Sequence, residues 1–332
     1  MAALLKQALA DPAACADLRK ALTVDDAILR DEMILKKEAF RPPAPSPTRL
    51  EAYAKCSYRY FSERILKLQE NEEDTRARNQ GIVMHGVLED FFKGPWKAIP
   101  PEKLEDWVDQ SMEAWLQKAP LDLGPYQTSL ARSEIKKILM RFIRYETGRL
   151  ETTAFQPRYF EYEIPKEKPV VVGSGKNKFS LQGKIDRVDV DAENKNFVIS
   201  DYKRARSFEK KSLENGTSLQ LPLYLLAVQN LLGLNPAGGQ LLNMKEMKPS
   251  GFYSEVVTEA KKKLSDQEFD EILERALRYS VRLLEELKSG KITVEPRDCR
   301  EGCGYVSVCR IEKWKLPEIS EKIRKQDKEL GF

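Results

Sequence analysis

Two aspartates and a lysine near the middle of the chain are the residues whose types and spacing best suit catalysis. Asp186 lies in the segment Gly183–Arg187 (GKIDR), and Asp201 opens the segment Asp201-Tyr202-Lys203. Carboxylates on two neighbouring strands can together hold a divalent cation such as Mg²⁺ or Mn²⁺. Because side chains alternate along a strand, Lys203 shares a face with Asp201. This arrangement would bring a metal and an ammonium group together, as the hydrolysis of a phosphodiester bond requires.

The same residues have a simpler interpretation, in which a hairpin carries local pairs of surface charges. Asp-x-Lys is common in unrelated sequences, so the pattern alone favours this interpretation. However, Asp201 ends the apolar run Phe197–Ser200, which is typical of a buried central strand. A carboxylate there is costly unless something pairs with it, and a divalent cation is a suitable partner. Lys203 would then orient the attacking water or stabilise negative charge at the phosphorus.

His85 is the only histidine among 332 residues, and it lies in the segment Gly81–Glu89. Imidazole is the commonest metal ligand of proteins, and Glu89, one helical turn later, can accept a hydrogen bond that fixes its tautomer. The alternative is an ordinary packed or exposed helix histidine. Downstream, Gln220 and Tyr224 lie one turn apart on a predicted helix. This pair either holds a phosphate or a base near the metal or serves only in helix packing.

The cysteines form a second candidate site. Cys299, Cys303 and Cys309 lie close together near the C-terminus, and Cys56, far upstream, is the best candidate for a fourth ligand. Four cysteines suit either a [4Fe–4S] cluster or a tetrahedral zinc ion, and their spacing alone does not decide between iron and zinc. The remaining cysteine, Cys15, is expected to be a buried free thiol.

The charge balance leaves nucleic-acid binding to local clusters, because the net charge is only +4 although 33% of the residues are charged. Arg204 and Arg206 follow the strand that carries Asp201, and we expect them to contact phosphate groups. A second cluster is either a phosphate-binding stripe or a solvated helix face: Lys136, Lys137, Arg141, Arg144 and Arg149. No apolar run approaches the roughly 20 residues that span a bilayer. Because the N-terminus also has no signal-peptide pattern, we expect a cytoplasmic protein with no membrane contact.

The hydrophobic periodicity predicts helices, then a sheet, then further helices and strands. Expected helices cover 1–38, 48–68 (with Thr48 as its cap), 81–92, 101–118, 128–152, 217–233 and 265–289. Expected strands cover 159–164, 179–190, 196–203, 240–245 and 251–257. A Pro-rich linker precedes Ser46, and 70–79 is expected to be a polar loop. This order is typical of an α/β fold in which a mixed central sheet is flanked by helices.

In their order along the chain, these motifs resemble those of the PD-(D/E)xK nuclease superfamily, above all its RecB-type exonuclease branch. That branch includes the nuclease domain of AddB-like helicase–nuclease subunits and the small CRISPR-associated nucleases. The resemblance rests on six segments: Ser46–Phe61, Gly81-x-x-x-His85, Gly183–Arg187, Asp201-Tyr202-Lys203, Gln220-x-x-x-Tyr224 and the three C-terminal cysteines. Each motif is short, but their joint order over residues 46–310 is specific.

The resemblance implies a restriction-endonuclease-like fold and a role for each matching residue. Four groups would bind Mg²⁺ or Mn²⁺: His85, Asp186, Asp201 and the backbone carbonyl of Tyr202. Lys203 would position and activate the water, and Gln220 and Tyr224 would contact nucleic acid. Four thiolates would hold a [4Fe–4S] cluster: Cys56, Cys299, Cys303 and Cys309. Three residues separate Cys299 from Cys303, where the family usually has two, so a structural Zn²⁺ is the alternative.

The resemblance also implies how the chain is divided. Residues 46–312 would form the nuclease domain, with a helical part (46–152), a sheet core (157–257) and a helix with the cysteine loop (265–312). Residues 1–45 would form a helical segment that ends in the Pro-rich linker, and 313–332 would form a C-terminal tail.

The implied function is that of a metal-dependent DNA nuclease, an exonuclease on single strands or duplex ends in DNA repair or recombination. Its implied partner is a helicase subunit. The alternative is a non-catalytic nucleic-acid-binding or assembly module of a helicase–nuclease complex. The segment Val172–Asn177 lacks the first glycine and the Ser/Thr of a phosphate-binding loop. We therefore expect a turn there and an ATP motor outside these residues.

Overall fold

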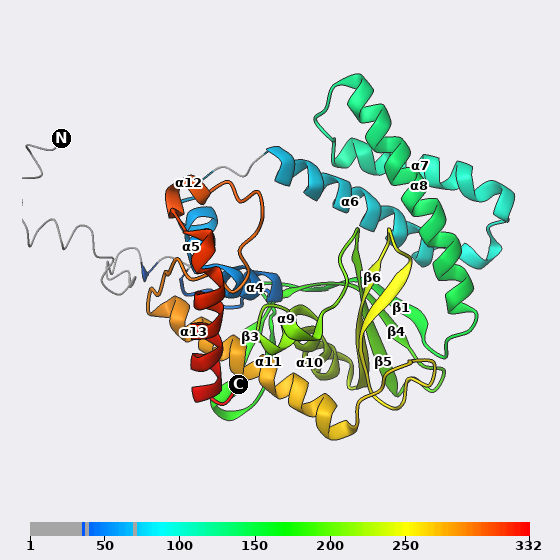
Figure 1. Cartoon of the computed structure of the whole chain (residues 1–332). Coiled ribbons are helices and arrows are strands. Elements are labelled where there is room, and N and C mark those ends of the chain that lie inside the picture. Colours follow the sequence, from blue (N-terminus) through cyan, green and yellow to red (C-terminus); the bar gives the residue numbers. More distant parts are fainter. Residues whose placement is uncertain (1–34, 37–39, 69–71) are drawn as a thin grey trace, which may run out of the picture.

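A five-stranded mixed sheet forms the centre of the protein in this computed structural model, which describes residues 35–36, 40–68 and 72–332 (Figure 1). The strands lie in the order β1-β4-β5-β6-β7: Gln156–Ile164, Gly183–Val190, Asn196–Lys203, Asn235–Asn243 and Lys248–Tyr253. β5 and β6 run parallel, and the other neighbouring strands are antiparallel. The expected α/β class with a mixed central sheet is confirmed.

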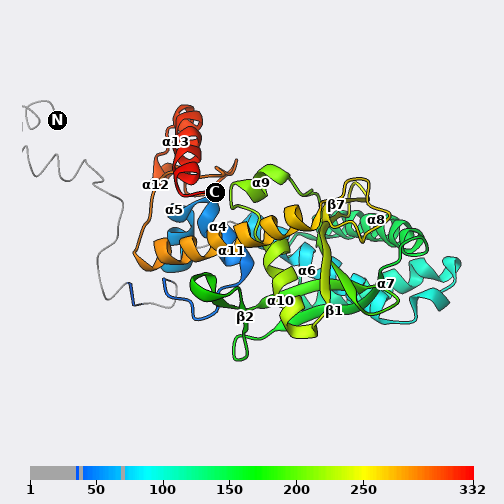
Figure 2. The same cartoon turned by 90° about the horizontal axis from the view of Figure 1, so that it is seen from below.

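Helices cover both faces of the sheet (Figures 1 and 2). One face packs against α4 (Pro47–Lys55), α10 (Gln220–Leu232) and α11 (Asp266–Lys288). The other face packs against α6 (Glu72–Lys93), α7 (Leu104–Lys118) and α8 (Pro125–Leu150). Within β5, Ile199 points into the first core and Tyr202 into the second, as the alternation along a strand requires. The strand is therefore buried on both sides, and its polar residues need partners inside the protein.

The parallel pair β5–β6 requires a crossover, because two parallel strands cannot be joined by a tight turn. The short helix α9 (Lys210–Glu214) and α10 supply this crossover. A crossover helix runs antiparallel to the strands it connects, so the first residues of α10 lie beside the end of β5. This topology brings Gln220 to the end of the strand that carries Asp201.

The strands depart from the expected pattern in several places. β1 begins before residue 159, β6 and β7 begin and end earlier than the expected strands 240–245 and 251–257, and the strand Val170–Val172 was not expected. Residues 179–190 were expected to form one strand, but β3 (Phe179–Leu181) and β4 are separate. β3 pairs with β2 (Val170–Val172) in a second, two-stranded sheet. The break occurs at Gln182, whose N–H donates to the carbonyl of Pro45 instead of to a strand. The turn expected within Val172–Asn177 is confirmed, since a short 3₁₀ turn, Gly175–Asn177, joins β2 to β3.

The helices correct three further expectations. The helix expected at 48–68 is interrupted at Cys56, where the backbone is extended, and continues as α5 (Ser57–Tyr60) and a π-helical turn (Phe61–Ile65). Its N-cap is Ser46, followed by a proline at the first helical position, and not Thr48. A polar loop was expected at 70–79, but α6 already begins at Glu72. A helix needs an apolar face only where it packs, so a polar sequence does not exclude a helix.

The C-terminal residues also form a helix, although a polar tail was expected. α13 (Leu316–Glu329) lies near α5 and the short α12 (Val306–Cys309) (Figures 1 and 2). Cys15 and nearly all of the helix expected at 1–38 lie outside the described residues. Within the described residues, none of the helices has the length and the apolar character needed to cross a membrane.

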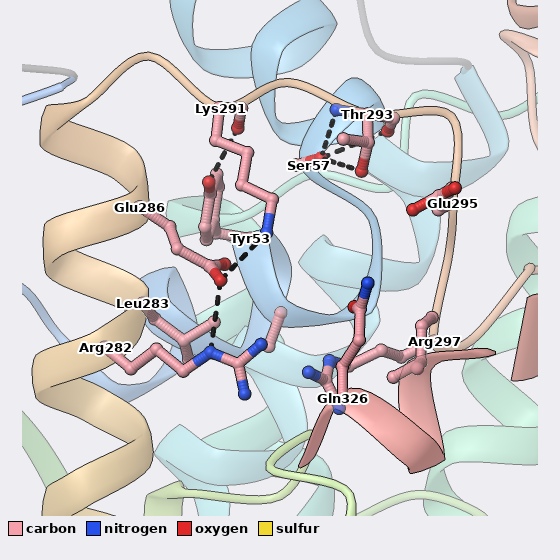
Figure 3. Close-up of a pocket in the computed structure, with 12 residues that line it drawn as sticks. Tyr53, Ser57, Arg282, Leu283, Glu286, Lys291, Thr293, Glu295, Arg297 and Gln326 are labelled. Atoms are coloured by element: carbon pink, nitrogen blue, oxygen red, sulfur yellow. Dashed lines mark hydrogen bonds and ion pairs between the residues drawn. The ribbon is translucent and has the colours of Figure 1, made fainter. Parts of the chain in front are cut away.

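Asp327 attaches α13 to the rest of the protein. Its carboxylate pairs with Arg297 and Arg282 and accepts a hydrogen bond from the hydroxyl of Tyr279. The Tyr279 ring stacks on Phe332, with ring centroids 4.2 Å apart. Beside these contacts, Figure 3 shows a polar cavity between α4, α11 and α13, in which Glu286 bridges Arg282 and Lys291. The C-terminal helix is therefore held mainly by charge pairs rather than by a broad apolar face.

We expect Asp327→Ala to lower the free energy of unfolding by about 2 kcal/mol, because charged hydrogen bonds typically contribute that much. Although burial opposes ionisation, Arg297 and Arg282 hold the pKa of Asp327 below its usual value. Its stabilisation is therefore present above about pH 4 and is lost as the pH falls towards the lowered pKa. Urea unfolding at several pH values measures this, with Glu329→Ala on the exposed side of α13 as control. Equal stability of the two variants would contradict the assignment.

Candidate active site

Asp186 and Asp201 meet at the middle of the sheet. The register of β4 and β5 pairs Arg187 with Ser200, so the two aspartates lie on adjacent strands across from each other. Asp186 Oδ2 accepts a hydrogen bond of 2.7 Å from the backbone N–H of Tyr202. Lys203 Nζ lies 2.5 Å from Asp201 Oδ2, as an ion pair. The structure thus brings together the three residues that the sequence indicated.

His85 reaches the same point from α6. Its Nδ1 lies 3.4 Å from Asp186 Oδ2, and its Nε2 lies 3.1 Å from the carbonyl oxygen of Tyr202. Glu89 lines the same pocket as His85, but its carboxylate pairs with Lys93 and does not orient the ring as expected. The carboxylates that face the ring come instead from the sheet.

Glu161 is the second carboxylate beside His85, and sequence reasoning missed it. The register of β1 and β4 places it across from Asp186, and its Oε1 lies 3.8 Å from His85 Nδ1. Its backbone has a φ of 44°, an unusual conformation for a residue other than glycine and one that collects at functional sites. Ligand atoms of His85, Glu161 and Asp186 all lie within 4.8 Å of one another. Two carboxylates and an imidazole are a donor set that fits a divalent cation.

The charges of this site are strongly interdependent. Burial opposes ionisation of His85, but Asp186 and Glu161 outweigh it and raise the pKa of the imidazole to about 10. Burial and the neighbouring Asp186 raise the pKa of Asp201 to about 6. The pKa of Asp186 itself is lowered, because His85 and Lys203 outweigh its burial. The positive charges of His85 and Lys203 therefore offset those of the acids.

Both oxygens of Asp201 have partners within the protein. Oδ1 accepts a hydrogen bond from Gln220, and Oδ2 lies 2.5 Å from the Lys203 ammonium. The fit to a divalent metal therefore rests on the donor set, which combines carboxylates with an imidazole.

Residues 44–310 match the family model of the PD-(D/E)XK nuclease superfamily, which covers most of the chain. The chain belongs to the PD-(D/E)XK nuclease superfamily. Its fold and its acidic site are those expected from that membership, and members of this superfamily use divalent metals.

Relatives of this PD-(D/E)XK chain are named as subunits of an ATP-dependent helicase/deoxyribonuclease. The protein from Caldanaerobacter subterraneus subsp. tengcongensis is 30% identical over 292 residues, which cover 81% of this chain and 24% of the relative. That from Clostridium novyi is 28% identical over 80% of this chain and 24% of the relative. A Clostridium botulinum protein is 24% identical over 82% of this chain and 30% of the relative. The chain thus spans about a quarter of the length of these relatives.

In this superfamily member, Gln220 and Tyr224 face the two acidic strands. Gln220 Nε2 donates a 2.6 Å hydrogen bond to Asp201 Oδ1. Tyr224 Oη accepts a 3.3 Å hydrogen bond from the backbone N–H of Lys184 in β4. The Tyr224 ring covers Gly183, where an added Cβ would lie 2.5 Å from its hydroxyl, which explains the glycine. The expected contact of this pair with nucleic acid stays a prediction.

Arg187 is the largest fully buried side chain, and its role was not foreseen from the sequence. Its guanidinium pairs with Asp189 at 2.7 Å and with Glu146 of α8 at 2.6 Å. It also donates a 2.9 Å hydrogen bond to the hydroxyl of Tyr202. Arg187 therefore joins α8, β4 and β5 on the face opposite Asp186, and it fixes the residue whose carbonyl contacts His85.

Some of the candidate phosphate-binding residues are paired with other side chains, and others are exposed. Arg204 donates to Gln80 and pairs with Glu134, whereas Arg206 is exposed. Within the stripe on α8, Lys136 pairs with Glu105 and Asp109, and Arg149 pairs with the buried Glu146. Three other members of the stripe are exposed: Lys137, Arg141 and Arg144. The expected contact of Arg204 and Arg206 with phosphate groups stays a prediction.

Four cysteines of this chain line one cavity of about 180 Å³: Cys56, Cys299, Cys303 and Cys309. Cys56 stands where α4 ends, and the other three come from the loop and short helix after α11. Burial and the neighbouring thiols raise the pKa of Cys56 and of Cys299. The structure thus brings together the four cysteines that the sequence indicated.

We expect Glu161→Gln to weaken the binding of Mn²⁺ at least about 10-fold, because changes in the ligand shells of metal sites typically have effects of this size. Calorimetric titration of Mn²⁺ into the metal-free protein measures the change. Glu163→Gln is the matched control, since Glu163 is exposed and lies two residues along the same strand. An unchanged affinity in Glu161→Gln would remove Glu161 from the metal site.

Proposed function

We propose that this chain is a metal-dependent DNA nuclease that hydrolyses phosphodiester bonds with a metal-activated water. The observation that carries the proposal is the convergence of His85, Asp186, Asp201 and Lys203 in a chain that belongs to a nuclease superfamily. A module that only bound nucleic acid would have no use for two buried carboxylates and an ammonium group at one point. The names of the relatives, which include deoxyribonuclease, support DNA as the substrate.

The metal ligands that we propose are His85, Asp186, Asp201 and the Tyr202 carbonyl, to which Glu161 is added. A bound Mg²⁺ or Mn²⁺ supplies a water of lowered pKa and offsets negative charge on the phosphate. His85 would bind the metal as a neutral imidazole, whereas Asp186 and Glu161 raise its pKa to about 10. Metal binding would therefore be accompanied by loss of a proton from His85.

Lys203 acts as a cation in this proposal. Burial lowers the pKa of its ammonium group, but Asp201 and Asp186 outweigh burial and raise the pKa. A protonated lysine donates hydrogen bonds and stabilises negative charge, but it cannot accept a proton. Its proposed work is to orient the attacking water and to stabilise the negative charge that develops at the phosphorus.

We further propose an exonuclease that acts on single strands or duplex ends, with a helicase as its partner. The relatives are named helicase/deoxyribonuclease subunits, and this chain corresponds to about a quarter of them. A helicase would supply single strands continuously to a nuclease beside it. The exposed basic residues Arg206, Lys137, Arg141 and Arg144 would guide the strand through phosphate contacts.

For the four cysteines we propose a [4Fe–4S] cluster. Their four thiols line one cavity of about 180 Å³. The cavity between the thiols supports a group larger than a single zinc ion. Such a cluster would join α4 to the C-terminal loop.

Asp201→Asn and Lys203→Ala are each expected to lower Mg²⁺- or Mn²⁺-dependent degradation of DNA at least about 10²-fold. Asp201→Asn removes an anionic ligand of the proposed metal, and Lys203→Ala removes the cation that stabilises charge at the reacting phosphate. Single-turnover cleavage of end-labelled linear single strands measures the rate. Lys195→Ala is the control, since Lys195 is exposed at the far end of β5. Wild-type rates in both variants would sink the proposed chemistry.

Circular single strands separate the two modes of cleavage in the same assay. An exonuclease degrades the linear strand and leaves the circle intact, whereas cleavage of the circle would mean an endonuclease. DNA binding without cleavage under either metal would instead support a non-catalytic module.

Anaerobically purified protein is expected to be brown and to contain iron and acid-labile sulfide, about four of each per chain. Cys303→Ser should lose the visible absorbance and most of the iron. Cys15→Ser is the matched control, because Cys15 is not among the proposed ligands. Stoichiometric zinc in place of iron would overturn the cluster assignment.

A further inference from the structure

The helix that carries Gln220 has no cap of its own. α10 begins at Gln220, and the preceding Leu219 offers no side chain that can accept a hydrogen bond. The first turn contains no acidic residue, and Pro222 has no N–H. The first N–H groups of a helix and the positive end of its dipole need an acceptor. For α10 this acceptor must come from another part of the chain.

Glu51 of α4, which lies 168 residues before Leu219, supplies the acceptor for the N-terminus of α10. Its Oε1 accepts hydrogen bonds of 2.8 Å from the N–H of Leu219 and 2.9 Å from the N–H of Gln220. Its other oxygen lies 3.3 Å from the ammonium group of Lys55. Glu51 is buried, with 7% of its surface exposed, so its negative charge acts on the helix end with little screening.

Gln220 connects Glu51 to Asp201. Its backbone N–H donates a hydrogen bond to Glu51, and its side-chain amide donates one of 2.6 Å to Asp201 Oδ1. Apolar contacts press α10 against the sheet, but they are non-directional and fix its position along its own axis only weakly. The hydrogen bonds from Glu51 fix that position at the end of the helix nearest Asp201.

The helix that carries Glu51 is itself held from the C-terminal side. The Tyr53 hydroxyl donates a 2.6 Å hydrogen bond to the carbonyl of Lys291. The carbonyl of Lys55 accepts from the N–H groups of Arg297 and Asp298. Glu51 is therefore an anchored acceptor and not a mobile surface carboxylate.

We propose that Glu51 is a positioning residue that orients Asp201 through the first residue of α10. The inference rests on the proposed function, because it gives Asp201 a role in holding metal. Loss of Glu51 releases the N-terminus of α10, moves Gln220 and weakens the metal site without removing any ligand.

Glu51→Ala is expected to weaken Mn²⁺ binding about 10-fold, the effect typical of losing a group behind a metal ligand. Glu51→Gln should weaken it less, because its carbonyl oxygen still accepts the two N–H groups while the charge is lost. Titration calorimetry measures the affinity. Amide hydrogen exchange of Leu219 and Gln220 reports the cap directly and should be faster in both variants.

Two controls separate positioning from a general loss of stability. Glu268→Ala removes the capping box of α11, far along the chain from the acids, and should lower the melting temperature but leave Mn²⁺ affinity unchanged. Lys55→Ala removes only the ion pair of Glu51 and should also leave affinity unchanged. A drop in affinity after Glu51→Ala no larger than that after Glu268→Ala would overturn the inference.

A double-mutant cycle tests the route through Gln220. In a Gln220→Leu background, Glu51→Ala should have little further effect on Mn²⁺ affinity, because the link to Asp201 is already cut. Additive losses would mean that Glu51 acts elsewhere and would refute the proposal. Failure of the native chain to cleave DNA would count against the proposed function, whereas amide exchange and Mn²⁺ affinity test Glu51 independently of cleavage. If Glu51→Ala does not fold, Glu51→Gln carries both measurements.

Discussion

Two buried carboxylates on adjacent strands repel each other, and most of the site can be understood as the means of keeping them together. Charged groups in a protein interior require opposite charges or hydrogen bonds. Asp186 has the imidazole of His85 and the N–H of Tyr202, and Asp201 has the ammonium group of Lys203 and the amide of Gln220. Burial and the repulsion that remains together raise the pKa of Asp201. A divalent cation would relieve this repulsion, so metal binding would also stabilise this region of the protein.

The topology decides from which elements those partners come. Because β5 and β6 are parallel, the crossover helix α10 must begin beside the end of β5, and it does so next to Asp201. Ligand sites of open α/β sheets commonly lie at the carboxyl ends of strands for this reason. On the other side, Arg187 ties β4 and β5 to α8. The sheet thus supplies the acids, Lys203 and the N–H of Tyr202, and the helices on its two faces supply His85 and Gln220.

The sequence predicted the residues whose positions follow from local rules, and the superfamily and fold class are confirmed. Asp201 and Lys203 share a face through strand alternation, and His85 stood out as the single histidine. Glu161 could not be found in this way, because its place opposite Asp186 depends on the register of β1 and β4, between which the β2–β3 hairpin is inserted. The role of Glu51 could not be predicted for a similar reason, since a cap supplied across 168 residues leaves no local sequence pattern. The helical C-terminus was missed because charge pairs at Asp327, and not an apolar stripe, hold it.

The contacts of α4 with the C-terminal segment also bear on how the domain folds. Lys55 receives its hydrogen bonds from Arg297 and Asp298, so the opening helix closes a loop that includes nearly the whole domain. Contacts of such high sequence separation are entropically expensive and form late. During synthesis from the N-terminus, α4 can form these two hydrogen bonds only after residues 297 and 298 have been added. The anchorage of the helix that carries Glu51 therefore depends on residues more than 240 positions further along the chain.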